Sequence, residues 1–269
     1  MRFEPRQPDA SVNVSSTHPL TEASTLLVGL SVLVAALMLV AYFSIELLIR
    51  VVPAGTEANW FAGLSPVESR APTSDAERAA ADLLAELAAQ WPDAPYAFRL
   101  EVLDDPTPNA LALPGGLVVI SQGLLDAVES ENALAFVLAH EIGHFHHRDH
   151  IRQLGRAAAV GLFATALGAA DGSTVGLTMT DLTMRGFGRA QEANADGFAL
   201  GVVNEHYGHV AGSWSFFERL IETEGDRRFA AYLSTHPASA QRIVALQEQA
   251  LGQNWRIDGP LSAWPPATR

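Results

Sequence analysis

The stretch ENALAFVLAHEIGHFHH, residues 131–147, indicates both the fold and the chemistry of this 269-residue chain. Ser130 precedes it as an N-cap, and the apolar run that follows predicts a buried helix. His140 and His144 are four residues apart, so both imidazoles project from one helical face, about 6 Å apart, and can reach one Zn²⁺. Glu141 is rotated by about 100° from His140, so its carboxylate can address a metal-bound water without being a ligand.

This arrangement suits hydrolysis. A zinc ion lowers the pKa of a bound water toward about 7 and polarises a carbonyl. Glu141 can accept the proton of that water and later pass it to the leaving amine. With nine histidines in 269 residues, a random HExxH should appear only about 0.02 times per chain, so chance is a poor explanation. The context adds support, because zinc proteases carry the pattern on an apolar helix of this kind. The sequence therefore predicts one Zn²⁺ site on this helix.

A catalytic zinc needs a third protein ligand and an open fourth position, and two residues compete for the third place. His150 has the spacing of the pattern HExxHxxGxxH, but His147 stands where that pattern has its chain-turning glycine. If the helix continues, His150 faces away from the metal. Glu192 is the better candidate, because Glu192 and Asp196 share a helical face in the segment EANAD. Asp196 can then reach the second ring nitrogen of a ligand histidine.

Composition narrows the classes of function. The chain has 17 basic and 30 acidic residues and a net charge of -13. Binding a phosphate backbone needs clustered cations, so the sequence predicts no nucleic-acid partner. The absence of cysteine excludes disulfides, thiolate zinc sites and cysteine nucleophiles. Any metal must therefore be held by His, Asp or Glu.

The N-terminal part predicts a single membrane anchor. Residues 25–45 carry no formal charge and are long enough, at about 1.5 Å per residue, to cross a hydrocarbon core of roughly 30 Å. A cleaved signal peptide is the alternative, but its apolar region would be only about 7–15 residues long. We expect residues 1–24 to form an N-terminal tail and residues 46–73 a linker, of which 51–73 is a tether punctuated by proline and glycine.

The charges around this span bear on its orientation. Arg2 and Arg6 precede the span, whereas only Arg50 follows it closely. The positive-inside rule then predicts a cytoplasmic N-terminus and an extracytoplasmic catalytic domain in a single-pass membrane protein.

Residues 74–251 are predicted to form the catalytic domain, and residues 252–269 a C-terminal tail whose last ten residues are loose. Ser74 and Glu77 have the spacing of a capping box and begin a helix. Strands are expected at residues 96–102, 109–113 and 117–120, the last two joined by a tight turn, with helices dominating afterwards.

A second apolar stretch, residues 157–170, is too short to span a membrane and predicts a helix packed over the site helix. The interval 151–188 contains Arg152, Arg156 and other charged residues, so we expect it to stay on one side of the membrane.

Together these motifs resemble peptidase family M48, the zinc endopeptidases that include the HtpX, BepA and CAAX prenyl protease types. The likeness runs from about residue 74 to 251. It includes NALALPGG at 109–116, HEIGH at 140–144, EANAD at 192–196, and Thr235-His236-Pro237 followed by Arg242-Ile243. The resemblance implies an α+β, mostly helical fold of the zincin (gluzincin) type, with a small β-sheet before the HExxH helix.

The resemblance also implies roles for individual residues. His140, His144 and Glu192 would bind zinc, Glu141 would be the general base, and Asp196 would support the site. It further makes His236 and Arg242 candidates for lining the cleft and stabilising the oxyanion. The alternative for these two is structural: a His-Pro at a helix start, and an arginine paired with an acidic neighbour.

The sequence thus predicts a membrane-anchored zinc endopeptidase acting on protein or peptide substrates. Residues 117–120 are expected to be an edge strand that holds an extended peptide, although they could equally be an internal strand. The alternative function is a membrane-tethered, zinc-stabilised module that binds clients without cutting them. An intact Glu141 argues against that alternative, because a pure binder gains nothing from a general base.

Overall fold

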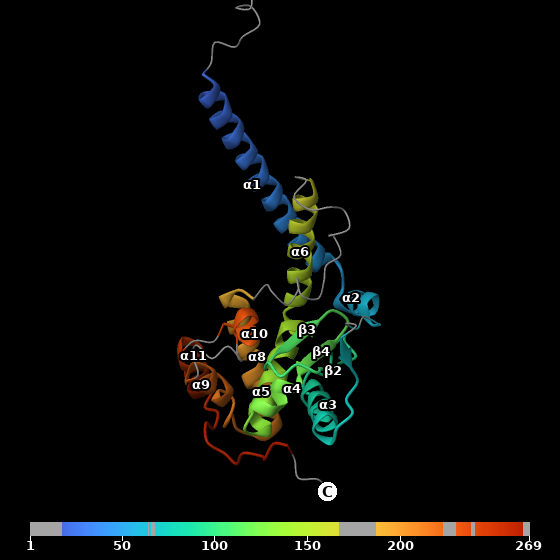
Figure 1. Ribbon diagram of the computed structural model, residues 1–269. Coiled ribbons are helices and arrows are strands. Elements are labelled where there is room, and N and C mark those ends of the chain that lie inside the picture. The colour runs from blue at the N-terminus through green and yellow to red at the C-terminus, as the bar shows by residue number, and fades with distance from the viewer. Residues whose placement is uncertain are drawn as a thin grey trace, which may run out of the picture. The chain divides into compact units, whose positions relative to one another are not determined.

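The computed structural model describes residues 18–63, 65, 68–166, 187–222, 230–237 and 240–265. The chain divides into two compact units, Met1–Ser44 and Ile45–Arg269. The described elements, shown in Figure 1, are α1 (Pro19–Val51), α2 (Ala54–Phe61), β1 (Ser69–Arg70), α3 (Asp75–Ala88), β2 (Arg99–Leu103), β3 (Ala110–Leu113), β4 (Leu117–Ser121), α4 (Gln122–Ala127), α5 (Glu131–His146), α6 (Asp149–Ala166), α8 (Arg189–Tyr207), α9 (Ser215–Glu222), α10 (Ala230–Thr235) and α11 (Ala240–Gly252).

Helix α1 contains the predicted span, residues 25–45. It has 33 residues and is therefore about 50 Å long, more than a hydrocarbon core of roughly 30 Å requires. Among the described residues it is the one helix that is long and apolar enough to cross a membrane, and its most apolar window has no buried residue. The expectation of one long apolar N-terminal helix is confirmed.

A small mixed sheet precedes the site helix, as predicted. Its strand order is β1-β2-β4-β3. Strands β2 and β4 run parallel, whereas β3 and β4 form an antiparallel hairpin in which Leu113 lies opposite Leu117. The turn between them uses Gly115 and Gly116 at φ of +87° and +82°, a conformation that costs glycine little and other residues much.

The expectation that residues 117–120 form the open edge of the sheet is wrong. Strand β4 lies between β2 and β3, and all of its residues are buried. The two edge strands are β1 and β3. The hairpin pattern alone could not reveal this, because its two strands are equivalent until β2 pairs with one of them, and β2 pairs with β4.

Helix α5 runs through the core and is buried from Asn132 to Phe145. It contacts α3, β3, α6 and α8. The predicted start of α3 is confirmed: Ser74 Oγ accepts a hydrogen bond from the Glu77 amide at 3.2 Å, and Glu77 Oε2 accepts one from the Ser74 amide at 3.0 Å. The fold is mostly helical with one small sheet, as the sequence predicts.

Two segments are more ordered than expected. The tether predicted for residues 51–73 contains α2 and β1, and Glu57 of α2 is buried, with the Tyr96 hydroxyl donating to it at 3.0 Å. The expectation of a loose C-terminal tail is also wrong for the residues as far as Pro265. Trp264 Nε1 donates a hydrogen bond to the Leu125 carbonyl at 3.1 Å. In both segments the partners lie far along the chain, so no local sequence pattern shows them.

The predicted helix at residues 157–170 is present as part of α6, which contacts α5. Residues 167–170, and much of the interval 151–188, lie outside the described residues.

Candidate metal centre

The HExxH residues lie deep in the protein. His140, Glu141 and His144 are all fully buried on α5. The helix begins where the sequence predicts, since Ser130 Oγ accepts a hydrogen bond from the Ala133 amide at 3.2 Å. The helix continues from this cap to His146, so His140 and His144, four residues apart, share one face.

The glycine inside HEIGH lets a second helix approach. A Cβ atom added at Gly143 would lie 2.9 Å from the backbone of Ala195, closer than real Cβ contacts come. Helices α5 and α8 are therefore in backbone contact at this point. Because Glu192 and Asp196 flank Ala195 on α8, the contact brings the EANAD segment against the two histidines.

Each ligand histidine is oriented by a carboxylate on its Nδ1 atom. Asp196 Oδ1 lies 2.9 Å from Nδ1 of His140, and Asp149 Oδ2 lies 3.1 Å from Nδ1 of His144. Carboxylates in these positions fix the tautomer, so both Nε2 atoms are left to bind a cation. The two Nε2 atoms lie 3.2 Å apart.

Asp149 is a site residue that the sequence analysis missed. It is 1% exposed, and Gln191 Nε2 donates to its Oδ1 at 2.7 Å. Arg148, directly before it, has a φ of +57°, and this left-handed residue turns the chain so that Asp149 comes back to His144. A single left-handed arginine gives no signal in the sequence.

Glu192 faces both histidines, as expected. Its Oε1 lies 3.6 Å from Nε2 of His144, and its Oε2 lies 3.6 Å from Nε2 of His140. Burial would raise the pKa of Glu192, but the surrounding imidazoles, first of all His236, outweigh burial and lower it. The carboxylate is therefore held in its charged form.

His236 was expected to line the wall of the cleft, but it lies closer to the candidate metal centre. Its Nδ1 lies 3.2 Å from both Nε2 of His140 and Oε1 of Glu192. His140, His144, Glu192 and His236 each offer a ligand atom, and these four atoms all lie within 4.8 Å of one another. The structure thus brings together the three predicted ligands and adds a fourth donor.

The donor set fits zinc. Zinc bonds of about 2.0–2.2 Å in a tetrahedron place ligand atoms about 3.3–3.6 Å apart. Five separations in this group, counting either oxygen of Glu192, are 3.2–3.6 Å. Three imidazoles and one carboxylate are also ligands that zinc accepts. Burial alone would lower the pKa of His144, but Asp149 and Glu192 raise it to about 9. At His140, burial outweighs the neighbouring carboxylates and lowers the pKa.

Glu141 lies beside this group without joining it. Its Oε1 is 3.5 Å from Nε2 of His236, and neither of its carboxylate oxygens has a hydrogen-bond partner among the described residues. A buried carboxylate without donors is costly, so it marks a place where a water or substrate atom is expected to bind.

Arg242 pairs with acidic neighbours, which matches the structural alternative for this residue. Its Nε and Nη2 donate to the two carboxylate oxygens of Asp196 at 2.8 and 2.7 Å, and its Nη1 lies 2.8 Å from Oε2 of Glu192. Arg242 therefore holds both carboxylates in place. His150 points away, as expected, with its Nε2 2.6 Å from Oε1 of Glu57.

Two aromatic residues that the sequence analysis did not single out cover the centre. The Phe187 ring stacks on the His144 ring with centroids 3.7 Å apart, and its amide donates to the Thr235 carbonyl. Tyr232 is fully buried with its ring 5.0 Å from that of His236. Its hydroxyl has no partner among the described residues, and burial together with the charge of Glu141 raises its pKa.

Comparison with known proteins agrees with this geometry. The model of Peptidase family M48 matches residues 70–250. The chain is 32% identical over 155 residues to the mitochondrial metalloendopeptidase OMA1 of Schizosaccharomyces pombe, which covers 56% of this chain and 46% of that protein. It is 30% identical over 158 residues to OMA1 of Saccharomyces cerevisiae (54% of this chain, 45% of that protein). It is also 30% identical over 150 residues to the metalloprotease LoiP of Escherichia coli (52% of this chain, 58% of that protein).

The chain spans about half the length of these curated relatives. The matched residues, 70–250, contain the whole candidate metal centre and every element that positions it. From the family model and the site geometry together, the chain belongs to peptidase family M48.

Proposed function

We propose that this protein is a membrane-anchored, zinc-dependent endopeptidase that hydrolyses peptide bonds of protein substrates. The observation that carries the proposal is the convergence of His140, His144 and Glu192 around one point, with the unpaired carboxylate of Glu141 beside it. When bound, zinc would polarise the substrate carbonyl and make the attacking water more acidic.

Each side chain at the centre has its own role in this proposal. Glu141 takes the proton of the attacking water and returns it to the leaving amine, and its burial keeps competing solvent away. Asp196 and Asp149 hold the ligand imidazoles in one tautomer. Arg242 fixes Glu192 and Asp196 relative to each other, so in this proposal it is a positioning residue.

His236 offers a further imidazole at this centre. Its Nδ1 is one of the four atoms that could hold the metal, and its Nε2 lies 3.5 Å from Oε1 of Glu141. An imidazole turned toward the substrate would donate to the oxyanion, the role that the sequence resemblance implies.

The substrate strand has a candidate partner in β3, the edge strand that contacts α5. An extended peptide beside β3 would be held by main-chain hydrogen bonds with little side-chain selectivity. In this structure only about 20 Å³ of space is lined by β3 residues together with Phe187 and Thr235. Peptide binding would therefore require these two residues to move.

The proposed anchor is α1, whose apolar residues are exposed. We place the catalytic unit on the extracytoplasmic side, following the arginines that flank the span. The relatives OMA1 and LoiP are named a metalloendopeptidase and a metalloprotease, and these names are consistent with endopeptidase activity in this chain.

The test is replacement of Glu141 by Gln in the full chain. Zinc content, measured by atomic absorption, should be unchanged, while new termini in an unfolded casein substrate, counted by mass spectrometry, should fall by orders of magnitude. A chelator should abolish cleavage by the wild type. If wild-type protein with zinc bound produces no new termini, the client-binding alternative holds; if the Gln variant still cleaves, Glu141 is not the base.

A further inference from the structure

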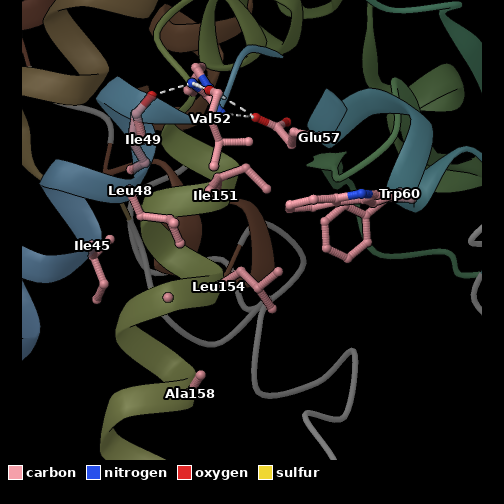
Figure 2. Close-up of a pocket in the computed structure, with 12 residues that line it drawn as sticks. Ile45, Leu48, Ile49, Val52, Glu57, Trp60, Ile151, Leu154 and Ala158 are labelled. Carbon is pink, nitrogen blue, oxygen red and sulfur yellow. Dashed lines mark hydrogen bonds and ion pairs between the residues drawn. The ribbon is translucent and has the colours of Figure 1, made fainter. Parts of the chain in front are cut away.

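A second cavity lies away from the metal centre, within the unit Ile45–Arg269. It has a volume of about 180 Å³ and is lined by the last turns of α1, by α2 and by the first half of α6. Figure 2 shows its walls. The residues that line these walls include Ile45, Leu48, Trp60, Ile151, Leu154 and Ala158.

The polar groups at one end of this cavity satisfy one another. Arg148 donates from Nε to Oε2 of Glu57 at 2.9 Å and from Nη1 to the carbonyls of Ile49 and Val52. The other Glu57 oxygen accepts from Tyr96. These bonds, drawn in part in Figure 2, leave this end without a need for a polar ligand. The remaining lining is hydrocarbon, so the cavity suits an apolar occupant.

The rim of the cavity is apolar and open. Leu48 and Trp60 line the cavity and yet are 56% and 67% exposed, and Leu47 and Val51 beside them are 62% and 69% exposed. A folded unit rarely leaves such a group of large apolar side chains in water. Tryptophan is typical of a membrane interface, and Trp60 lies on this rim.

One wall of the cavity continues the proposed anchor. Residues 45–51 are the last two turns of α1, whose earlier residues form the apolar span. The opening is therefore covalently adjacent to a segment that lipid would surround. A dry apolar cavity of about 150 Å³ holds a small hydrocarbon such as benzene, so 180 Å³ is enough for the end of an acyl chain.

We propose that this cavity binds an acyl chain of a membrane phospholipid. The proposal rests on α1 being a membrane anchor, as argued above. Three observations favour lipid over a protein segment as the occupant. The wall of the cavity continues into the anchor, its rim is apolar, and the polar groups at its end are already hydrogen-bonded.

The experiment uses the full chain in nanodiscs that contain a phosphatidylcholine with a diazirine at the end of one acyl chain. After illumination, labelled positions are mapped by mass spectrometry. We expect labels on α2 and α6, around Trp60, Ile151 and Leu154, as well as along residues 25–44. Labels along 25–44 without labels on α2 and α6 overturn the acyl-chain site and leave the anchor intact. No label at 25–44 overturns the anchor and the site with it.

Variants that fill the cavity separate specific binding from general membrane contact. Ala158→Phe should reduce labelling of α2 and α6 at least fivefold and leave residues 25–44 labelled. Ala159→Phe adds the same side chain one position along, outside the residues that line the cavity, and should keep the wild-type pattern. Leu154→Phe is a second filling variant should Ala158→Phe fail to fold. Undiminished labelling of α2 and α6 in a folded filling variant overturns the proposal.

A benzophenone side chain introduced at position 154 identifies the occupant directly. A cross-link to phospholipid supports the proposal. A dominant cross-link to a second copy of the chain, to residues 167–186 or to a substrate protein overturns it.

Discussion

His144 and Asp149 are joined across the end of α5, with Nδ1 of the histidine 3.1 Å from Oδ2 of the aspartate. The contact mirrors that of His140 with Asp196, so both imidazoles of the HExxH pattern are held by a carboxylate. Only the Asp196 contact is anticipated by the sequence.

Replacement of Asp149 by Asn should lower zinc affinity about 10–100-fold, because the amide no longer fixes the tautomer of His144. Competition with a chromogenic chelator measures this change. Asp126→Asn, on an exposed residue far along the chain from either ligand, is the control and should bind zinc like the wild type. Equal affinity in both variants would remove Asp149 from the metal centre.

Gly143→Ala should disturb the contact between α5 and α8. The added methyl group would lie 2.9 Å from the Ala195 backbone, and overpacking of this kind costs about 1–3 kcal/mol of stability. Because Glu192 is one turn from Ala195, zinc affinity should fall as well. Urea unfolding and zinc titration report the two effects.

The matched control for Gly143 is Gly201→Ala on α8. Its methyl group would meet Trp255 at 3.7 Å, an ordinary contact, so the variant should be as stable as the wild type or slightly more stable. If Gly143→Ala behaved like this control, close helix contact would not be what the glycine provides.

His236→Phe should retain zinc, because His140, His144 and Glu192 remain, but with reduced affinity. Loss of the imidazole that would donate to the oxyanion should slow cleavage of an unfolded substrate by about 100-fold. His206→Phe, near the end of α8, is the control and should match the wild type. Unchanged cleavage at full zinc occupancy would exclude His236 from that role.

The capping glutamate of α3 predicts a pH dependence of stability. Hydrogen bonds from Arg70 lower the pKa of Glu77 and outweigh its burial. A carboxyl whose pKa is lower in the folded state stabilises the fold above its ordinary pKa of 4.5 and loses this contribution as the pH falls below that value.

Glu77→Gln should therefore reduce the free energy of unfolding by about 1–3 kcal/mol at pH 7, with a smaller difference from the wild type at pH 3. Urea unfolding at several pH values measures the difference. Glu248→Gln, on an exposed residue of α11, should keep the wild-type stability at each pH. A loss for Glu77→Gln that is equal at pH 7 and pH 3 would contradict this explanation.

Local patterns in the sequence determined the helix that carries HExxH, its cap at Ser130, the apolar N-terminal helix and the hairpin around Gly115. In each case the physical cause lies within a few residues: a helical period, a capping side chain, or a backbone angle that glycine allows. The same reasoning singled out Glu192, because one helical face carries both Glu192 and Asp196.

Only the tertiary structure decided what depends on contacts between distant segments. It placed β4 inside the sheet and β3 at its edge, ordered α2 around the buried Glu57, and brought Asp149 back to His144 through the left-handed Arg148. It also set His236 among the ligand atoms, 96 residues after His140. Periodicity shows which face of an element is buried but not which element covers it, so these relationships could be found only in the folded chain.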